Sequence, residues 1–303
     1  MNTIYYLGPP ETFTEQAAKN FANILDSKTT DASTLVQQPN LTKTITAVTL
    51  PEQFAVMPYY NLIEGLIQET LDLLVEHRLT IYAARQIPVQ FALGGFLPKE
   101  HDDALTVYSH PKALAQCTVF LQRHYPTAIL RETPSTAQGV RQVAENRFGL
   151  AVARREALEK SGIPVLQDNI GNRQYSRQNY TEFLFAGTPE NPVSHQLPTT
   201  KHRRTLIAVI PTVDRVGLLA DILGQIAFFG INLLKIHSRP ALTEVRGQEH
   251  APQMFYLETD VAADSPELQL CIETLNMRLV KQGEIANHRV VRILGSYCLH
   301  TCT

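Results

Sequence analysis

The stretch GTPENPVSHQLPTTKHRR, residues 187–204, decides how this chain is organised. Three prolines, many polar side chains and no apolar periodicity are typical of a linker. The chain is therefore expected to consist of a first part, residues 1–188, a linker, residues 189–203, and a second part, residues 204–303. The basic end of the stretch is interpreted as a solvated loop, because the whole chain carries a formal net charge of −2.

Short apolar runs alternate with helical patterns before the linker. Thr12-x-x-Glu15 and Ser135-x-x-Gln138 have the spacing of capping boxes, and each is expected to open a helix. A further helix is expected where apolar residues recur at helical spacing. Its apolar positions are Ile63, Ile67, Leu71 and Leu74. Strands are expected at residues 4–7, 54–57, 105–108, 128–130, 149–153 and 180–186. This alternation predicts an α/β fold with a mostly parallel, doubly wound sheet.

The stretch from Leu79 to Phe96 reads as extended and apolar, and is expected to cross between two lobes. Two lobes with a cleft between them would place strand ends and helix N-termini around a ligand. The order of elements changes after the linker. Strands are expected at 205–210, 231–242, 253–261 and 290–297, and helices at 214–229 and 265–281. The order β-α-β-β-α-β is that of the ferredoxin-like split unit.

The composition excludes several classes of protein. Hydrophobic residues make up 44% of the 303 residues and charged residues 18%, which is typical of a globular protein. The charge gives no basic footprint for nucleic acid, and no segment has the length of a membrane span. The four cysteines form no C-x-x-C pair and have no metal-ligand spacing with histidine. The sequence predicts a cytoplasmic protein without a metal, a cofactor, a nucleic-acid partner or a membrane partner.

Short motifs follow one another along both parts of the chain. The first part contains Gly8-Pro-Pro-Glu-Thr-Phe-Thr14, Ile63-Glu-Gly65, His110-Pro-Lys-Ala-Leu-Ala-Gln-Cys117, Ser135-Thr-Ala137 and Asn179-Tyr-Thr-Glu-Phe183. The second part contains Gly217-Leu-Leu219, Ile231-Asn-Leu-Leu-Lys-Ile-His-Ser-Arg-Pro240 and Leu294-Gly-Ser-Tyr297. Over nearly the whole chain these motifs resemble the prephenate dehydratase family, in the family's order. The resemblance implies a two-lobed fold like that of periplasmic binding proteins, followed by a small amino-acid-sensing ACT domain.

The resemblance also implies an activity. Enzymes of this family convert prephenate to phenylpyruvate with loss of water and carbon dioxide, in L-phenylalanine biosynthesis, and need no cofactor. Prephenate carries two carboxylates and a ring hydroxyl. The protein therefore needs cations and aimed donors to orient the dianion, and a hydrogen-bond donor for the departing hydroxyl. Feedback regulation by phenylalanine and a homodimer or homotetramer are expected as well.

Candidate site residues follow from the motifs. The helices after Thr12 and Ser135 offer free backbone N–H groups to carboxylates, and the hydroxyls of Thr12, Thr14, Ser135 and Thr136 are expected to be further donors there. By resemblance Thr181 assists the departing hydroxyl, Phe183 forms a wall for the ring, and the substrate site also includes Tyr60 and Asn61. The alternative for each is structural, because hydroxyl residues commonly cap helices and Thr181 and Phe183 are also ordinary strand residues.

The chain departs from the family pattern at five positions. Tyr60 and Leu62 replace Glu and Ser of one motif, Glu182 replaces an Arg, and Glu11 and His237 replace Gly and Glu. Three arrangements are compatible with Glu182. It faces away from the cleft, or Arg173 or Arg177 supplies the lost cation, or Glu182 acts as a general acid with Tyr60 as its hydrogen-bond partner.

The second part is expected to bind an amino acid, with L-phenylalanine as the effector. By resemblance the effector-binding residues are Gly217, Leu218, Asn232, Ser238 and Arg239; the alternative is a dimerisation domain without a ligand. Two rival functions remain open for the whole chain. One is a decarboxylase that retains the ring hydroxyl, and the other is a non-catalytic sensor of aromatic ligands.

Overall fold

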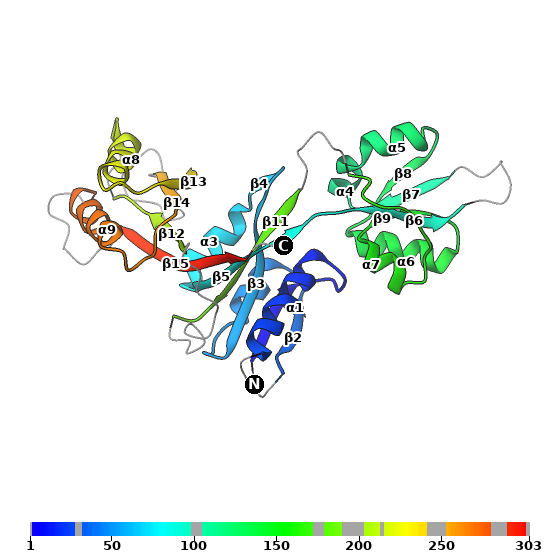
Figure 1. The fold of residues 1–303 in the computed structure, drawn as a ribbon, viewed down its shortest axis with the longest axis horizontal. Helices are drawn as coiled ribbons and strands as arrows, with labels where there is room; N and C mark the ends of the chain where they lie inside the picture. The colour runs from blue at the N-terminus through cyan, green and yellow to red at the C-terminus, as the bar shows by residue number, and fades with distance from the viewer. Residues whose placement is uncertain are drawn as a thin grey trace.

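The computed structural model describes residues 2–27, 32–97, 105–171, 179–189, 203–212, 215–240, 253–279 and 290–300. These residues form three bodies in a row (Figure 1). The middle body, called lobe 1, holds the N-terminal strands, and lobe 2 lies on one side of it. The ferredoxin-like unit lies on the other side. The arrangement confirms the predicted fold class of a two-lobed α/β part followed by a β-α-β-β-α-β unit.

Lobe 1 is a five-stranded mixed sheet with a short added strand. Its strands are ordered β5-β11-β3-β1-β2, and β4 pairs with β3. Its elements are β1 (Thr3–Leu7), α1 (Phe13–Asp26), β2 (Thr34–Gln38), α2 (Leu41–Thr46), β3 (Gln53–Asn61), β4 (Gly65–Leu66), α3 (Gln68–His77), β5 (Thr80–Pro88) and β11 (Tyr180–Gly187). Strand β11 runs antiparallel to both of its neighbours. The sheet is therefore mixed rather than mostly parallel.

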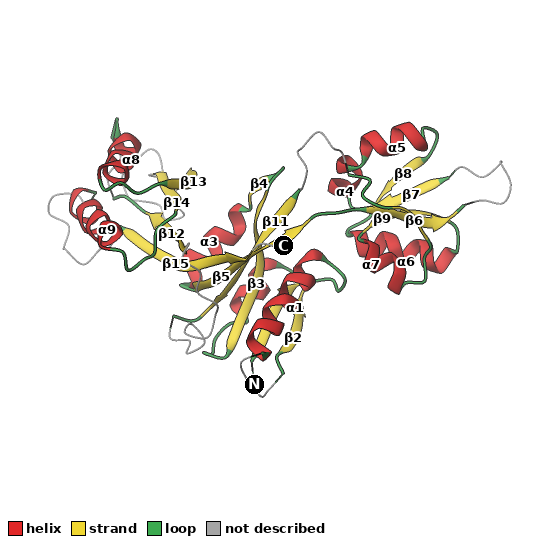
Figure 2. Ribbon diagram, in the orientation of Figure 1, coloured by secondary structure: helices red, strands yellow, loops and turns green. Residues whose placement is uncertain are grey.

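Lobe 2 is a second sheet, ordered β10-β6-β9-β7-β8 (Figure 2). Its elements are β6 (Ala92–Phe96), β7 (Thr106–Ser109), α4 (Pro111–Gln116), α5 (Thr118–His124), β8 (Ile129–Glu132), α6 (Thr136–Asn146), β9 (Gly149–Ala153), α7 (Arg155–Lys160) and β10 (Val165–Gln167). The chain enters lobe 2 between β5 and β6, which confirms that the apolar stretch from Leu79 to Phe96 crosses between the lobes.

The ferredoxin-like unit has the strand order β13-β14-β12-β15, with antiparallel neighbours throughout. Its elements are β12 (Arg203–Val209), α8 (Leu218–Phe228), β13 (Leu233–Pro240), β14 (Gln253–Thr259), α9 (Pro266–Arg278) and β15 (Val291–His300). Both helices pack on one face of this sheet around Ile207, Ile222, Leu257 and Leu268. The predicted linker, residues 189–203, lies between the end of β11 at Gly187 and the start of β12 at Arg203, and it is largely outside the described residues.

The ferredoxin-like unit and lobe 1 share one continuous sheet, because β15 pairs in parallel with β5. Gly295 of β15 lies opposite Ile81 of β5. A Cβ atom on Gly295 would lie 2.3 Å from the Ile81 carbonyl oxygen, so only glycine allows the two strands to approach this closely.

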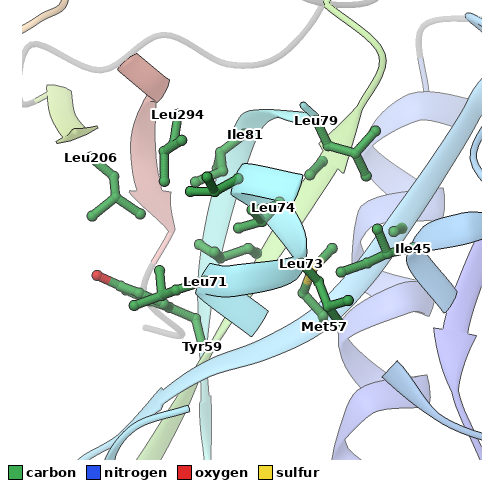
Figure 3. Packing of buried hydrophobic residues seen from close by; sticks show 14 of the residues in the cluster. Ile45, Met57, Tyr59, Leu71, Leu73, Leu74, Leu79, Ile81, Leu206 and Leu294 are labelled. Atoms are coloured by element: carbon green, nitrogen blue, oxygen red, sulfur yellow. The ribbon is translucent and has the colours of Figure 1, made fainter. Parts of the chain in front are cut away.

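The two bodies also share one hydrophobic core. Tyr59, Leu71 and Ile81 of lobe 1 pack with Leu206 and Leu294 of the ferredoxin-like unit (Figure 3). Each of these five side chains is at most 3% exposed. Lobe 2 has separate cores of its own. Lobe 1 and the ferredoxin-like unit are therefore two bodies joined by a shared core, and lobe 2 is joined to lobe 1 by the strand crossings.

The helix expected from the apolar repeat at Ile63 begins later than predicted. Helix α3 starts at Gln68, and the residues before it form a turn and the short strand β4. Gly65, with a φ of +83°, and the pairing of β4 with β3 account for the difference. The first apolar residue of the repeat is therefore not helical, although Leu71 and Leu74 are buried on α3 as expected.

Candidate active site

A pocket of about 310 Å³ lies between the two lobes, which is a size suited to a small metabolite. Residues from both lobes line it. Seven of the nine residues expected at the catalytic and substrate site are among them: Thr12, Thr14, Asn61, Ser135, Thr136, Thr181 and Phe183. The structure thus brings together residues that are up to 171 positions apart, between Thr12 and Phe183.

Two helices begin at the pocket, one in each lobe. The hydroxyl of Thr12 accepts a hydrogen bond from the Glu15 N–H at 3.3 Å, and that of Ser135 accepts one from the Gln138 N–H at 3.1 Å. Both residues are therefore helix caps that also line the pocket. The N–H groups of the first turn have no partner within the helix, and the helix dipole favours an anion there. The two helix ends are suited to carboxylates entering from the cleft.

The hydroxyl of Thr12 is already fully used. It donates to the carbonyl oxygen of Pro9 at 3.1 Å while it accepts the bond from Glu15. The expectation that this hydroxyl donates to a ligand is therefore corrected: Thr12 brings its helix end to the pocket and not a hydroxyl hydrogen.

Asn61 is held in a single orientation by four hydrogen bonds. Its Oδ1 accepts from the N–H groups of Ile63 and Glu64 at 3.0 and 3.1 Å, which identifies the oxygen of the amide. Its Nδ2 therefore donates, to the Tyr180 carbonyl oxygen at 3.2 Å and to Thr181 Oγ1 at 2.9 Å. Both hydrogens of the amide are used in this way, so Asn61 is a fixed donor to Thr181.

This fixed donor determines what the Thr181 hydroxyl can do. Since Oγ1 accepts a hydrogen from Asn61, its own hydrogen has to point elsewhere. Among the described residues no hydrogen bond uses the Thr181 hydroxyl hydrogen. Thr181 lines the pocket beside Phe183, and its side chain is buried. The site therefore presents an O–H donor next to an aromatic wall.

Glu182 and Tyr60 do not line the pocket, and this corrects their assignment to the catalytic and substrate site. Side chains alternate across a strand, so Glu182 lies on the opposite face of β11 from Thr181 and Phe183. Glu182 is 2% exposed and is directed to the ferredoxin-like unit, where it binds Lys235. A general-acid role in the cleft is incompatible with this position. Of the three arrangements considered, the one in which Glu182 faces away is confirmed. Residues 172–178, which include Arg173 and Arg177, lie outside the described part of the chain.

Four charged side chains from both bodies form what we call the interface ion cluster: Glu182, Arg204, Lys235 and Glu258. Lys235 Nζ lies 2.5 Å from Glu182 and 2.7 Å from Glu258. Arg204 lies 3.7 Å from Glu182 and 3.4 Å from Glu258. The two carboxylates are 2% and 1% exposed, and the formal charges of the four residues sum to zero.

Three tyrosines surround the interface ion cluster. Lys235 Nζ lies 4.9 Å from the ring centroid of Tyr59 and 4.6 Å from that of Tyr60. The hydroxyl of Tyr297 donates to Glu258 at 2.9 Å, and that of Tyr59 at 3.4 Å. Burial, followed by the charge of Glu258, raises the pKa of Tyr59 and of Tyr297, so both phenols stay neutral donors. The carboxylate of Glu258 thus has donors on several sides.

The pocket contains further polar residues that were not assigned to the site from the sequence, although three of them lie in the motif that begins at His110. They are Glu64, His110, Lys112 and Gln116. Lys112 of lobe 2 forms an ion pair with Glu64 of lobe 1 across the cleft. Gln116 accepts a hydrogen bond from Asn179 at 2.9 Å. Among the described residues that line the pocket, Lys112 is the single lysine or arginine, and its ammonium is paired with Glu64, so a substrate carboxylate has to share it with Glu64 or displace Glu64.

Arg154 connects the two lobes beside the pocket. It donates to the Thr12 carbonyl oxygen at 3.2 Å, and its guanidinium carbon lies 5.2 Å from the centroid of the Phe13 ring. The contact fixes the loop that opens α1 against lobe 2. Glu11 in the same loop has a φ of +67°, a conformation that glycine adopts without strain, which gives a physical reason for glycine at this position of the motif.

The residues expected to bind an effector do not form one cluster within the chain. Gly217, with a φ of +82°, and Leu218 lie at the start of α8, whereas Asn232 follows the far end of this 11-residue helix. A helix of this length spans about 16 Å. Leu218 packs into the core, Ser238 is exposed, and Arg239 pairs with Asp72 of α3. The binding role of these residues stays a prediction.

Two structural absences bear on the expectations for partners and cofactors. The described helices include none that is long and apolar enough to cross a membrane. Within the same described ranges, no group of three or more acidic, histidine or cysteine side chains is arranged to hold a metal ion.

The fold and the pocket define a two-lobed α/β ligand-binding protein with an attached ferredoxin-like unit. The family model for prephenate dehydratase matches residues 4–191. The chain belongs to the prephenate dehydratase family.

Individual relatives extend this similarity over the whole chain. A prephenate dehydratase of Amycolatopsis methanolica is 31% identical, over 98% of this chain and 88% of its own length. The crystal structure of a prephenate dehydratase from Arthrobacter aurescens in complex with L-Phe has a TM-score of 0.78 and 27% identity, covering 98% of this chain and 90% of that chain. GqqA, a quorum quenching acylase, shares the fold with a TM-score of 0.73, covering 98% of both chains at 22% identity.

Proposed function

We propose that the protein is a prephenate dehydratase, a cytoplasmic carbon–oxygen lyase that converts prephenate to phenylpyruvate. The observation that carries the proposal is the Thr181 hydroxyl, whose oxygen is occupied by Asn61 and whose hydrogen is free for a ligand in the pocket. A departing hydroxide needs a donor of this kind. The family supplies the substrate, and the pocket volume is compatible with it.

Binding of the substrate is assigned to positive groups on both lobes. The helix ends at Thr12 and Ser135 and the ammonium of Lys112, which the substrate shares with Glu64 or takes from it, receive the two carboxylates. Phe183 packs against the six-membered ring from lobe 1. With groups from both lobes holding one molecule, substrate binding favours a closed cleft, which excludes water from the reacting atoms.

Chemistry then requires two bonds to break in the ring. The bond to the ring carboxylate breaks, carbon dioxide leaves, and its electron pair enters the ring. The bond to the ring hydroxyl breaks at the opposite carbon, and hydroxide leaves and takes up a proton from solvent to become water. The Thr181 O–H donates a hydrogen bond to the oxygen on which negative charge develops, and Asn61 holds this donor in place.

Regulation by L-phenylalanine is part of the proposal. A relative with a TM-score of 0.78, whose similarity covers 98% of this chain, is bound to L-Phe. Among the candidate effector residues, Gly217 and Leu218 lie at one end of α8 and Asn232 lies beyond the other, so an effector site that uses both ends requires a second copy of the chain. A homodimer or homotetramer is therefore proposed as the functional form.

The test is to incubate the purified protein with prephenate and identify the product by its ultraviolet spectrum and mass. Phenylpyruvate supports the proposal. A decarboxylated acid that retains the ring hydroxyl would instead identify a decarboxylase, and unchanged prephenate with measurable binding would identify a sensor. Thr181→Val, which keeps the side-chain shape but removes the hydroxyl, should lower kcat by about 100-fold or more, and Thr181→Ser should retain most of it.

A further inference from the structure

We propose that Lys235 of the ferredoxin-like unit is a positioning residue for the reaction, and that it acts on Thr181 through the buried carboxylate of Glu182. The inference rests on the proposed dehydratase activity and extends it to a defined contact between the two bodies. Lys235 touches neither the pocket nor Thr181. Its effect is exerted through strand β11, which carries Glu182 on one face and Thr181 on the other.

The first step of the argument is the position of Glu182. It directly precedes Phe183 and directly follows Thr181, and the three side chains alternate between the faces of β11. The Glu182 carboxylate is fixed by Lys235 at 2.5 Å and by Gln86 of β5 at 3.0 Å. A rotation of β11 that moves this carboxylate also moves the Thr181 hydroxyl, because both are attached to the same short length of backbone.

The second step is a local irregularity in the sheet. Glu182 pairs with Tyr60, but the next residue, Phe183, pairs with Pro58, so β3 has one extra residue at this point. Such a bulge interrupts the ladder of backbone hydrogen bonds and increases the local twist. The backbone ladder on the β3 side of β11 is therefore interrupted beside Glu182, while the pairing of β11 with β5 is regular from Tyr180 to Phe185. The contact of Glu182 with Lys235 is an additional restraint on β11 at this point.

The third step is the origin of Lys235. It lies on β13, the edge strand of the shared sheet, and Ser238 and Arg239 follow it on the same strand. A ligand that shifts β13 would move the Lys235 ammonium between its two carboxylates, Glu182 and Glu258. The carboxylates belong to different bodies, since Glu258 is part of the ferredoxin-like unit. Through Lys235, a shift of β13 would thus change the orientation of β11 beside Thr181.

The interface ion cluster is also sensitive to the loss of one charge. Lys235 is 17% exposed and Arg204 is 27% exposed, while both carboxylates are almost completely buried. Removing Lys235 leaves two buried carboxylates in the cluster but only the one cation of Arg204. One negative charge is then uncompensated in surroundings of low polarity. The carboxylates would then move apart or admit water, and either response displaces β11.

The experiment is steady-state kinetics on Lys235→Met, Glu182→Gln and the double variant. Each single variant should lower kcat by about 10- to 100-fold with KM within about twofold, because substrate contacts persist while the donor is misplaced by a fraction of an ångström. The double variant should lose no more than the worse single variant, because both changes remove the same contact. It also keeps the cluster neutral, with Glu258 and Arg204 remaining, and so avoids a folding defect.

Two further measurements separate positioning from mere support of the fold. Lys235→Arg should restore kcat to within about threefold of the wild type, because it returns a cation to the cluster. Inhibition by phenylalanine should weaken at least fivefold in Lys235→Met and Glu182→Gln. The matched control is Asp72→Asn, which breaks another contact between the two bodies, Asp72 to Arg239, but on α3 rather than on β11. It should lower the melting temperature and leave kcat unchanged.

The proposal is overturned if the wild type forms phenylpyruvate and the folded double variant has wild-type kcat, or if Asp72→Asn lowers kcat as much as Lys235→Met does. A wild-type protein that forms no phenylpyruvate contradicts the proposed function itself, which is a different result. The wild-type sample therefore tests the proposed function, and the variants in the same assay test the role of Lys235.

Discussion

Tyr60 and Glu182 lie directly opposite each other on the neighbouring strands β3 and β11, and both contact Lys235 rather than the pocket. The departures from the family motifs at Tyr60 and Glu182 are thus two halves of one local change. At the pair of positions where the motifs have Glu on β3 and Arg on β11, this chain has an aromatic ring and a carboxylate. The carboxylate next to Lys235 comes from β11 in this chain, and Asn61, Thr181 and Phe183 of the same two strands line the pocket.

This relationship predicts how the two positions depend on each other. Glu182→Arg alone would place a third cation beside Lys235 and Arg204, and should lower the free energy of unfolding by about 3–5 kcal/mol. Adding Tyr60→Glu supplies a carboxylate opposite the new guanidinium and should recover more than half of the loss. Urea unfolding of the wild type, Glu182→Arg and the double variant measures both effects. A double variant as unstable as Glu182→Arg would contradict the cross-strand pairing.

The orientation of Asn61 predicts an unusual order of activities. Asn61→Asp has almost the same shape, but its second carboxylate oxygen would accept the Thr181 hydrogen and turn it away from the pocket. Asn61→Ala leaves that hydrogen free to rotate. We expect kcat to fall by about 100-fold or more in the Asp variant and by about 10-fold in the Ala variant. If the Asp variant is the more active of the two, the hydroxyl does not act as the donor.

The backbone at Glu11 predicts a stabilising substitution. A residue with a side chain at a φ of +67° is strained, whereas glycine is not. Glu11→Gly should raise the free energy of unfolding by about 0.5–1 kcal/mol, even after the cost of a more flexible unfolded chain. Glu11→Ala is the control, since it removes the ion pair with Lys160 but keeps the strain, and it should not stabilise. Differential scanning calorimetry distinguishes the two.

The environment of His110 predicts a loss of stability in acid. Burial, and then the nearby Lys112 ammonium, lower the pKa of His110 below its ordinary value of 6.5. The unfolded chain therefore binds a proton at this residue more readily than the folded protein, and the stabilising contribution, complete above pH 6.5, is lost as the pH falls through the lowered pKa.

His110→Asn tests this contribution without removing the cap of α4. The His110 Nδ1 accepts the Lys112 N–H at 3.3 Å, and asparagine is also a good cap residue that does not titrate. Urea unfolding at pH 7.5 and pH 5.5 should show a smaller loss of stability on acidification for the variant than for the wild type. Equal losses in both proteins would show that His110 does not contribute.

The contact between Gly295 and Ile81 predicts that a single methyl group disturbs the shared sheet. Gly295→Ala would place its Cβ 2.3 Å from a backbone oxygen, so a strand has to move, and we expect a loss of about 2–3 kcal/mol. Gly224→Ala is the matched control. Gly224 lies within α8 with open space around it, and alanine there should stabilise the protein by up to about 1 kcal/mol. Thermal unfolding of both variants provides the comparison.

Much of the fold could be predicted because local patterns decide it. The caps at Thr12, Ser135 and Ser265 mark where helices begin, and the structure has α1, α6 and α9 at those places. The order of elements after the linker was enough for the ferredoxin-like topology. The strands β4 and β10 and the helices α2 and α7 are short, so they contain too few residues to show a period. Strand β2 is an edge strand without a fully buried residue, so its sequence lacks the apolar run that marks the other strands.

The candidate site was predictable to the extent that motifs named its residues, but not the direction in which each residue points. Tyr60 and Glu182 belong to motifs that line the pocket, yet they face the other body. The bulge that directs both Tyr59 and Tyr60 to Lys235 depends on the pairing of β3 with β11, residues more than 100 positions apart. The charged partners on the ferredoxin-like unit are likewise set by tertiary packing. Sequence spacing does not contain this information.

The common core of lobe 1 and the ferredoxin-like unit means that the ferredoxin-like unit is not a detachable module. A polypeptide that stopped near residue 188 would leave Tyr59, Leu71 and Ile81 in water and would expose β5 as a bare sheet edge, ready to pair with other chains. The C-terminal third of the chain thus works as a permanent cover for the N-terminal part. Mutations in that third that disturb the shared core would then reduce the amount of folded protein in the cell, even where they lie far from the pocket.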